Sequence, residues 1–217
     1  MANIIKDKIL ENKIIAIVRG VSKNNILKTV ESLLNGGIKL IEVTYNHESK
    51  KSLEETLQMI KMINNEYKSD VILGAGTVLT AEQVIRAVQA GAEYIISPNT
   101  DIEVIKKTKE LLKISIPGAF TASEVVTAYN LGADLVKLFP AGLLGTEYIK
   151  AIRGPLNHIP LLVTGGVDLT NINKFMKVGA AGAGIGGSLV NKANIDEGEF
   201  HKIKLMAQEY VSEIKCR

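Results

Sequence analysis

Two charged residues lie inside apolar segments of the sequence, where burying a charge is unfavourable. Lys137 is within Leu135–Phe139, and Glu42 is within Leu40–Val43. A lysine removed from water has a lowered pKa, so its free amine can attack a carbonyl carbon and form a Schiff base. A neighbouring carboxylate can move the protons that this chemistry needs. If both side chains face one interior, the pair predicts a nucleophile and a general acid and base.

Both charges also have ordinary structural explanations. The stem of Lys137 could pack on apolar surface while its ammonium group reaches water. Glu42 could be exposed at the rim of a sheet, or the two residues could form a buried ion pair, which contributes little to stability. These alternatives stay open at this point, because they depend on which way the two side chains point.

Two glycine-containing segments could bind a phosphate group. Thr164–Gly166 and Gly186–Ser188 each follow a short apolar segment. Glycine lets backbone N–H groups approach phosphate oxygens closely. Turns also use glycine pairs, so either segment alone is a weak indication. Both together, after the last two predicted strands, favour a phosphate monoester as ligand.

Eight short apolar segments predict buried strands. They recur roughly every 20 to 30 residues, the spacing of a strand–helix unit, and most are apolar on both faces, as in a parallel sheet covered by helices. The predicted strands are Ile14–Val18, Leu40–Tyr45, Val71–Leu73, Tyr94–Ser97, Ile114–Pro117, Leu135–Phe139, Leu161–Thr164 and Ala183–Gly186.

Helical spacing of apolar residues is found between these strands. The predicted helices are Ala2–Glu11, Asn24–Asn35, Ser52–Asn64, Ala81–Ala90, Asp101–Leu112, Ser123–Asn130, Glu147–Ile152, Asn171–Val178 and Glu197–Lys215. Thr80, Asp101, Thr121 and Thr170 are the predicted N-caps. Glycines follow several predicted helices, where a left-handed residue ends the helix.

The alternation predicts the α/β class and a (β/α)8 TIM barrel with a short N-terminal helix, as one domain spanning residues 1–217. An open doubly wound sheet is the alternative. The first predicted strand is not followed by G-x-G-x-x-G, and Gly74-Ala75-Gly76 in the third unit lacks the third glycine. In a barrel, catalytic residues collect at the C-terminal ends of the strands.

Composition excludes several other classes of protein. Of 217 residues, 46% are hydrophobic and 23% are charged, so the chain is not intrinsically disordered. A net charge of +3 without a basic block does not indicate a nucleic-acid partner. Cys216 is the single cysteine, and His47, His158 and His201 lack metal-ligand spacing, so we expect neither a disulfide framework nor a metal site. No apolar run is long enough to span a membrane, and we expect a cytoplasmic protein.

Seven segments resemble the motifs of one enzyme family. In chain order they are Glu42–Thr44, Gly74–Leu79, Ile96–Pro98, Pro117–Gly118 with Thr121 and Glu124, Val136–Ala141, Thr164–Val167 and Gly186–Ser188. Over nearly the whole chain they are similar to the 2-keto-3-deoxy-6-phosphogluconate (KDPG) and 4-hydroxy-2-oxoglutarate (KHG) aldolases. The resemblance implies a class I, metal-independent aldolase without a cofactor, on a (β/α)8 barrel and as a homotrimer. It would cleave KDPG to pyruvate and glyceraldehyde 3-phosphate, and KHG to pyruvate and glyoxylate.

The resemblance also implies roles for individual residues. Lys137 corresponds to the Schiff-base lysine and Glu42 to the general acid and base. The substrate-binding positions are Arg19, Thr44, Asn46, Thr77, Pro98 and Phe139, with Thr77 at the pyruvate carboxylate and Pro98 and Phe139 as apolar walls. The phosphate-binding positions are Thr164, Gly165, Gly166, Gly187 and Ser188.

One position departs from the family pattern. Well-known members have an arginine four positions after the glutamate, where this chain has Asn46. The change makes Arg19 the more important candidate for binding the substrate carboxylate. An asparagine at this position is also a point of resemblance to the sister enzyme, which acts on the galactonate epimer. Thr164 and the segment Lys137–Ala141 resemble the gluconate enzyme more closely. A phosphate-binding barrel isomerase or epimerase, or a catalytically inactive sugar-phosphate-binding protein, remains a further alternative.

Overall fold

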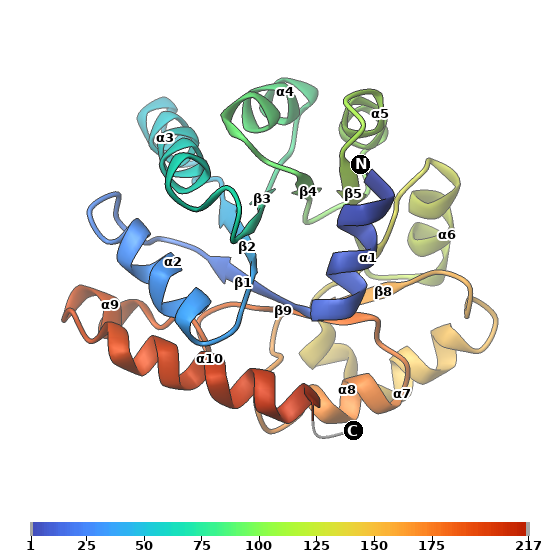
Figure 1. The fold of residues 1–217 in the computed structure, drawn as a ribbon. Coiled ribbons are helices and arrows are strands. Elements are labelled where there is room, and N and C mark those ends of the chain that lie inside the picture. The colour runs from blue at the N-terminus through green and yellow to red at the C-terminus, as the bar shows by residue number, and fades with distance from the viewer. Residues whose placement is uncertain (1, 216–217) are drawn as a thin grey trace.

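The structure is a computed structural model that describes residues 2–215, so Cys216 lies outside it. Strands and helices alternate along this part of the chain, and the strands pair in parallel within one sheet (Figure 1). The strands are β1 (Ile14–Val18), β2 (Leu40–Thr44), β3 (Ile72–Gly76), β4 (Tyr94–Ile96), β5 (Ile114–Ile116), β6 (Gly118–Ala119), β7 (Val136–Leu138), β8 (Leu161–Thr164) and β9 (Gly182–Ile185). The helices are α1 (Ala2–Asn12), α2 (Ile26–Asn35), α3 (Lys50–Tyr67), α4 (Ala81–Ala90), α5 (Ile102–Glu110), α6 (Ala122–Asn130), α7 (Ala141–Arg153), α8 (Ile172–Lys177), α9 (Lys192–Asp196) and α10 (Phe200–Lys215).

The sheet is almost closed into a barrel. Its strand order is β5-β4-β3-β2-β1-β9-β8-β7-β6, and the two outermost strands, β5 and β6, are separated in the chain by Pro117 alone. Pro117 has no N–H to donate, but its carbonyl accepts a hydrogen bond of 2.9 Å from the N–H of Lys137. The interrupted fifth strand therefore pairs with β4 on one side and with β7 on the other. The predicted (β/α)8 barrel is confirmed, and the open doubly wound alternative is wrong.

Apolar side chains fill the N-terminal part of the barrel interior. Ile15, Leu40, Ile72 and Leu162, from four different strands, belong to one buried cluster together with Ile9 of α1. Figure 1 shows α1 lying across the ring of strands. The N-terminal helix therefore packs into that end of the barrel and leaves the C-terminal end for a site.

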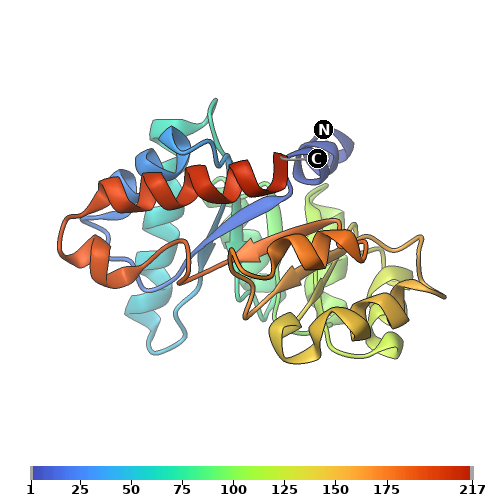
Figure 2. The same ribbon diagram turned by 90° about the horizontal axis from the view of Figure 1, so that it is seen from below.

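A second apolar core lies between the strands and the surrounding helices. Residues that alternate with the interior ones, such as Ile41 and Val43 of β2, point outward into this core. The C-terminal helix α10 completes the helical layer by packing against α2 (Figures 1 and 2). Successive residues of each strand therefore have distinct environments, which decides which residues can reach a site inside the barrel.

The local signals at the helix ends are confirmed in most places. Thr80, Asp101 and Thr121 cap their helices, each accepting a hydrogen bond from a backbone N–H of the first turn. Glycines 37, 91, 132 and 179 have the positive φ that was expected after four helices. The N-cap prediction for Thr170 is wrong, because its hydroxyl donates to Asp168 Oδ1 (2.6 Å) and Asn171 precedes α8.

Three elements differ from the sequence prediction. The fifth strand continues beyond Pro117 as β6. Helix α7 begins at Ala141 rather than Glu147, with a kink at Gly145, where φ is 73°. Helix α9, which consists of five residues, was not predicted.

Candidate active site

Lys137 and Glu42 face each other across the barrel interior. Lys137 is the middle residue of β7 and Glu42 the middle residue of β2. When β5 and β6 are counted as one interrupted strand, four steps separate β2 and β7 in either direction round the ring. Their strand neighbours, including Val136 and Leu138, belong to the core outside the sheet, so both charged side chains point inward. Lys137 is 6% exposed and Glu42 1% exposed. The explanation of a glutamate exposed at the rim is therefore wrong.

Burial sets the protonation of the two groups. It raises the pKa of the Glu42 carboxyl, while the positive charges of Lys137 and then Arg19 lower it. Burial also lowers the pKa of the Lys137 amine; the negative charge of Glu42 opposes this shift and the charge of Arg19 adds to it. The site thus favours a neutral amine more than water does, which suits a nucleophile, and a carboxyl that can hold a proton, which suits a general acid.

Glycine in β3 makes room for Glu42. A Cβ atom at Gly76 would lie 1.7 Å from Glu42 Oε1, so no larger residue fits there without moving the carboxylate. Both carboxylate oxygens are buried, and neither has a hydrogen-bond partner among the residues that the structure describes. Among the described residues the carboxylate is therefore held by the packing around it and by the charges of Lys137 and Arg19 rather than by hydrogen bonds.

A polar cluster lies at the ends of β1 and β3. Arg19 Nη2 donates a hydrogen bond of 3.0 Å to Thr77 Oγ1, and His47 Nε2 lies 2.8 Å from the Thr77 carbonyl oxygen. Thr77 has a left-handed backbone with φ of 56°. The arginine and the threonine hydroxyl are a suitable pair for a carboxylate, because both can donate to its oxygens. The sequence singled out Arg19 and Thr77, and His47 is exposed, as expected, although it contacts the Thr77 carbonyl.

The C-terminal end of the barrel contains a cavity of about 590 Å³. Ten of the predicted site residues line it: Arg19, Thr77, Pro98, Lys137, Phe139, Thr164, Gly165, Gly166, Gly187 and Ser188. Glu42 and Thr44 are buried in β2 and are not part of its lining, and the Thr44 hydroxyl donates to the Val18 carbonyl (3.4 Å). Asn46 is exposed and donates to Glu48 instead of reaching the cavity.

The glycine segments form one side of this cavity. Gly165 has φ of 83°, and a Cβ there would lie 2.9 Å from the Phe139 ring, so glycine is required. At Gly187 a Cβ would meet nothing within 4 Å, so its backbone faces open space. Thr164 contributes a buried hydroxyl without a hydrogen-bond partner among the described residues. The arrangement offers donors to an anion on the side of the cavity formed by the segments that follow β8 and β9.

Other residues of the site were missed by sequence reasoning. Ser188 Oγ donates to the Val167 carbonyl (3.2 Å) and accepts a hydrogen bond of 3.0 Å from the Tyr210 hydroxyl in α10. Asp168 also lines the cavity, and hydrogen bonds from Thr170 hold the pKa of its carboxyl below the usual range. No local pattern marks Tyr210, because its ring simply continues the apolar face of a helix. The remaining lining residues are Ile17, Val167 and Gly184, which were not predicted, and Gly186, which belongs to the predicted phosphate-binding segment Gly186–Ser188.

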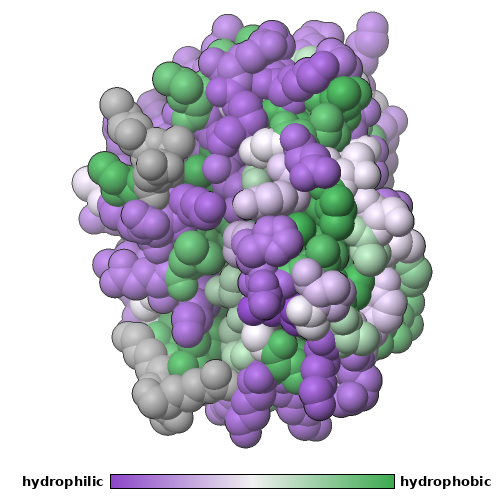
Figure 3. Space-filling view, turned by 90° about the vertical axis from the view of Figure 1, so that its right-hand side faces the viewer, coloured by the Kyte–Doolittle hydropathy of each residue, from purple (hydrophilic) through white to green (hydrophobic). Residues whose placement is uncertain are grey.

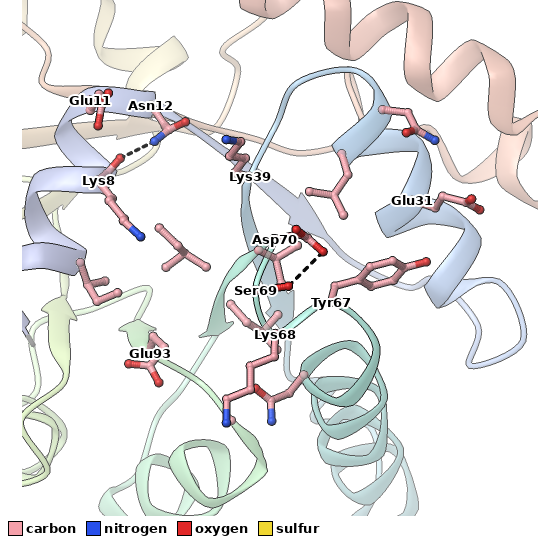
Figure 4. Close-up of a pocket in the computed structure, with 18 residues that line it drawn as sticks. Lys8, Glu11, Asn12, Glu31, Lys39, Tyr67, Lys68, Ser69, Asp70 and Glu93 are labelled. Atoms are coloured by element: carbon pink, nitrogen blue, oxygen red, sulfur yellow. Dashed lines mark hydrogen bonds between the residues drawn. The ribbon is translucent and has the colours of Figure 1, made fainter.

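A larger cavity of about 870 Å³ opens near the N-terminal ends of β2, β3 and β4. Figure 4 shows side chains of both charges around it, among them Lys8, Lys39, Lys68, Asp70 and Glu93. Neither Lys137 nor Glu42 lines this cavity. Because barrels place their chemistry at the C-terminal ends of the strands, the smaller cavity is the candidate active site.

Residues 2–215 lack the side-chain clusters of a metal site and the long apolar helices of a membrane protein. Among these residues, no group of three or more His, Cys, Asp and Glu side chains is placed to hold a metal ion. Within the same range no helix has the length and hydropathy needed to cross a bilayer.

Known proteins share the fold and the sequence over most of the chain. A family model for KDPG and KHG aldolases matches residues 5–206. The 2-dehydro-3-deoxy-6-phosphogalactonate aldolase of Escherichia coli K12 is 34% identical over 81% of this chain and 83% of its own length. The 2-dehydro-3-deoxy-phosphogluconate aldolase of Haemophilus influenzae is 28% identical over 96% of both chains. A KDPG aldolase structure from Legionella pneumophila, with pyruvate captured as a covalent carbinolamine, is 25% identical, covers 94% of this chain and 96% of its own, and has a TM-score of 0.83.

Proposed function

The chain belongs to the KDPG and KHG aldolase family and is therefore a carbon–carbon lyase, and from this premise we propose that it cleaves a 2-keto-3-deoxy-6-phospho sugar acid through a Schiff base on Lys137. The observation that carries the proposal is the placement of Lys137 and Glu42, buried on opposite strands and facing one interior. The covalent carbinolamine in the Legionella pneumophila relative supports the same chemistry. An isomerase or epimerase does not require this pair, and family membership decides against it.

The first half of the reaction forms the imine. The neutral amine of Lys137 adds to the C2 carbonyl of the substrate to give a carbinolamine. Glu42 in its acid form protonates the C2 hydroxyl, which leaves as water, and a protonated imine remains. The lowered pKa of Lys137 supplies the amine, and the raised pKa of Glu42 supplies the acid.

The second half breaks the carbon–carbon bond. The ionised Glu42 carboxylate takes the proton of the C4 hydroxyl, the C3–C4 bond breaks, and its electron pair moves into the imine to form an enamine. The C4 fragment leaves as an aldehyde. Glu42 then protonates C3 of the enamine. Water adds to the protonated pyruvate imine, and the proton released by its hydrolysis returns to Glu42, so that pyruvate leaves Lys137 as a neutral amine and Glu42 as the acid again. Each proton that Glu42 accepts is returned within one turnover, so no cofactor is needed.

The residues that line the cavity support one orientation of the substrate. The C1 carboxylate lies toward Arg19 and Thr77, and Pro98 and Phe139 form apolar walls beside the reacting carbons. The phosphate lies against Thr164, Gly165, Gly166, Gly187 and Ser188. Thr44 packs beneath the carboxylate end. Because Asn46 is directed toward Glu48, Arg19 replaces the arginine that other members have after the glutamate.

The KDPG epimer is the first candidate substrate, with glyceraldehyde 3-phosphate and pyruvate as products, and KHG cleavage to pyruvate and glyoxylate is the unphosphorylated counterpart. The galactonate epimer is the second candidate. It is favoured by Asn46 and by the 34% identity to the Escherichia coli galactonate enzyme. The two differ at C4, where bond cleavage occurs, so kcat/KM measured on both epimers distinguishes them.

Borohydride trapping with pyruvate tests the Schiff base. Reduction of the imine leaves a stable adduct that peptide mass spectrometry can place on one lysine. We expect the adduct on Lys137 and its loss in Lys137→Arg, whereas Lys113→Arg, at a lysine paired with Glu93 on the surface, keeps it. An adduct elsewhere, or none on folded protein, would reject Lys137 as the nucleophile.

We also propose that the enzyme is a cytoplasmic homotrimer. The exposed hydrophobic residues include Ile102 in α5, Phe120 before α6 and Leu143 in α7, the last being 87% exposed. Figure 3 shows hydrophobic side chains on the side of the molecule that carries these helices. Covering them with a second copy would remove them from water. Sedimentation equilibrium should give three times 23.5 kDa, and a mass of one chain would reject the trimer.

A further inference from the structure

Tyr94 is a buried polar group that the mechanism above does not use. It lies in β4, its side chain is 0% exposed, and it belongs to the cluster inside the barrel. Its hydroxyl has no hydrogen-bond partner among the residues that the structure describes. Buried tyrosine hydroxyls normally have a partner, because leaving one unpaired destabilises the protein. A phenylalanine would fill the same space without this cost, so the hydroxyl of Tyr94 needs an explanation.

The register of the sheet places Tyr94 in one row with Glu42. Glu42 of β2 is the register partner of Gly74 in β3, and Gly74 is the register partner of Tyr94 in β4. A Cβ at Gly74 would lie 2.0 Å from the Tyr94 ring, so the phenol lies over β3. Glu42 lies over the same strand at Gly76. The two side chains therefore approach each other over two glycines from opposite sides of β3.

The groups that face Glu42 come from three other strands. Lys137 of β7 and Arg19 after β1 are cations, and each acts on the Glu42 charge. Tyr94 of β4 is the third group. Its burial is the larger cause, and the negative charge of Glu42 the smaller cause, of a phenol pKa well above the usual range. The phenol is therefore protonated throughout the working range of the enzyme. It can donate to the carboxylate, and it cannot compete with Glu42 as a base.

We propose that Tyr94 is a positioning residue whose hydroxyl donates a hydrogen bond to the Glu42 carboxylate, directly or through one water molecule. This inference rests on the proposed function, because it assumes that Glu42 is the general acid and base. A hydrogen bond from a neutral donor stabilises the ionised carboxylate and fixes its orientation without adding a charge beside Lys137. The hydrogen bond would give a partner to two of the three unpartnered atoms, the Tyr94 hydroxyl and one carboxylate oxygen of Glu42, and it would leave the other carboxylate oxygen for the reaction.

Tyr94→Phe tests the proposal, since it removes one oxygen and keeps the ring. We expect kcat for cleavage to fall about tenfold, the order of one hydrogen bond to a charged group, with KM little changed because Tyr94 does not line the cavity. The acid limb of the kcat profile should move to higher pH, because an unassisted Glu42 carboxylate holds its proton more tightly. Tyr45→Phe is the matched control. Tyr45 is also buried, but its hydroxyl donates to Gln83 outside the barrel, and its loss should leave the profile in place.

A double-mutant cycle separates positioning from structure. If Tyr94 acts through Glu42, Tyr94→Phe should have no further effect on kcat in the Glu42→Gln background. An unmoved acid limb in Tyr94→Phe, or an equal loss of kcat in both backgrounds, would overturn the inference. Borohydride trapping on Lys137 is measured in parallel. Its failure in the wild type would reject the proposed function itself, whereas trapping that succeeds without a shift in the profile rejects only the role of Tyr94.

Discussion

Gly76 offers the sharpest test of how the barrel holds its general acid and base. In Gly76→Ala, the added Cβ would stand 1.7 Å from Glu42 Oε1, whereas real Cβ contacts are essentially never shorter than 3.0 Å. The carboxylate must therefore move by about 1.3 Å. Misplacement of a catalytic group by about 1 Å can reduce the rate by about 10²-fold. We expect a loss of this size in kcat. The Lys137 adduct should form more slowly, because Glu42 also assists imine formation, but it should still accumulate on prolonged trapping, because the nucleophile itself lies on the strand opposite Glu42.

Pyruvate release coupled to lactate dehydrogenase measures the loss. Overpacking in a core costs about 1–3 kcal/mol, so the melting temperature of the variant must be recorded alongside its rate. Gly154→Ala is the control, because Gly154 has a right-handed helical backbone and a Cβ there meets its nearest atom at 3.4 Å. A folded Gly76→Ala enzyme with wild-type kcat would refute the assignment of Glu42. A variant that loses trapping and turnover together would show that the change disrupts the whole interior rather than one carboxylate.

Three further predictions concern the chemistry, the phosphate end and stability. Lys137→Arg keeps a positive charge but no usable amine, so turnover should fall below detection; measurable pyruvate release would contradict the mechanism. Tyr210→Phe removes the hydrogen bond to Ser188 and should raise KM for phosphorylated substrates several-fold, on the order of one hydrogen bond, while KM for KHG stays the same; equal changes on both substrates would argue against a phosphate site there. Lys137→Met combined with Glu42→Gln should raise the free energy of unfolding at pH 7 by about 1–4 kcal/mol, as seen when buried ion pairs are replaced. Because the pKa of Glu42 is raised in the folded protein, its contribution to the free energy of unfolding is fully present below pH 4.5 and is lost as pH rises. Because the pKa of Lys137 is lowered, its contribution is fully present above pH 10.5 and is lost as pH falls. The advantage of the neutral pair in urea denaturation should therefore be greatest between these values, and a constant difference across pH would contradict it.

The fold could be predicted from the sequence because the patterns that indicate strands, helices and helix ends are local and repeated. Most of the predicted strands are apolar on both faces, and glycines with positive φ follow α4 and α6 as expected. Lys137 and Glu42 could also be found, because a charge within an apolar strand stands out in one dimension. Their positions on opposite sides of the barrel could not be inferred from the sequence directly. This inference required the closed strand order, in which β2 and β7 are opposite.

The elements that sequence reasoning missed depend on contacts between distant segments. Tyr94 looks like an ordinary buried strand residue, and only the register of β2, β3 and β4 brings its hydroxyl toward Glu42. Tyr210 reaches Ser188 across 22 positions of sequence. Thr170 was a reasonable N-cap by type, but Asp168 two positions earlier accepts from its hydroxyl and N–H instead. A side chain with two available partners cannot be assigned from its residue type alone.

The division of the barrel interior explains how two buried charges can be kept reactive. Packed apolar side chains close the interior on the N-terminal side of the charged pair. They come from four strands and from helix α1, and they are Ile15, Leu40, Ile72, Leu162 and Ile9. The cavity that contains Lys137 opens at the other end, where Arg19 and the glycine segments lie. Substrate and water therefore approach from one side only, and binding of the substrate displaces water from the amine. Burial of Lys137 in this interior is the main cause of its lowered pKa, so the packing that closes the N-terminal end also contributes to the reactivity of the lysine.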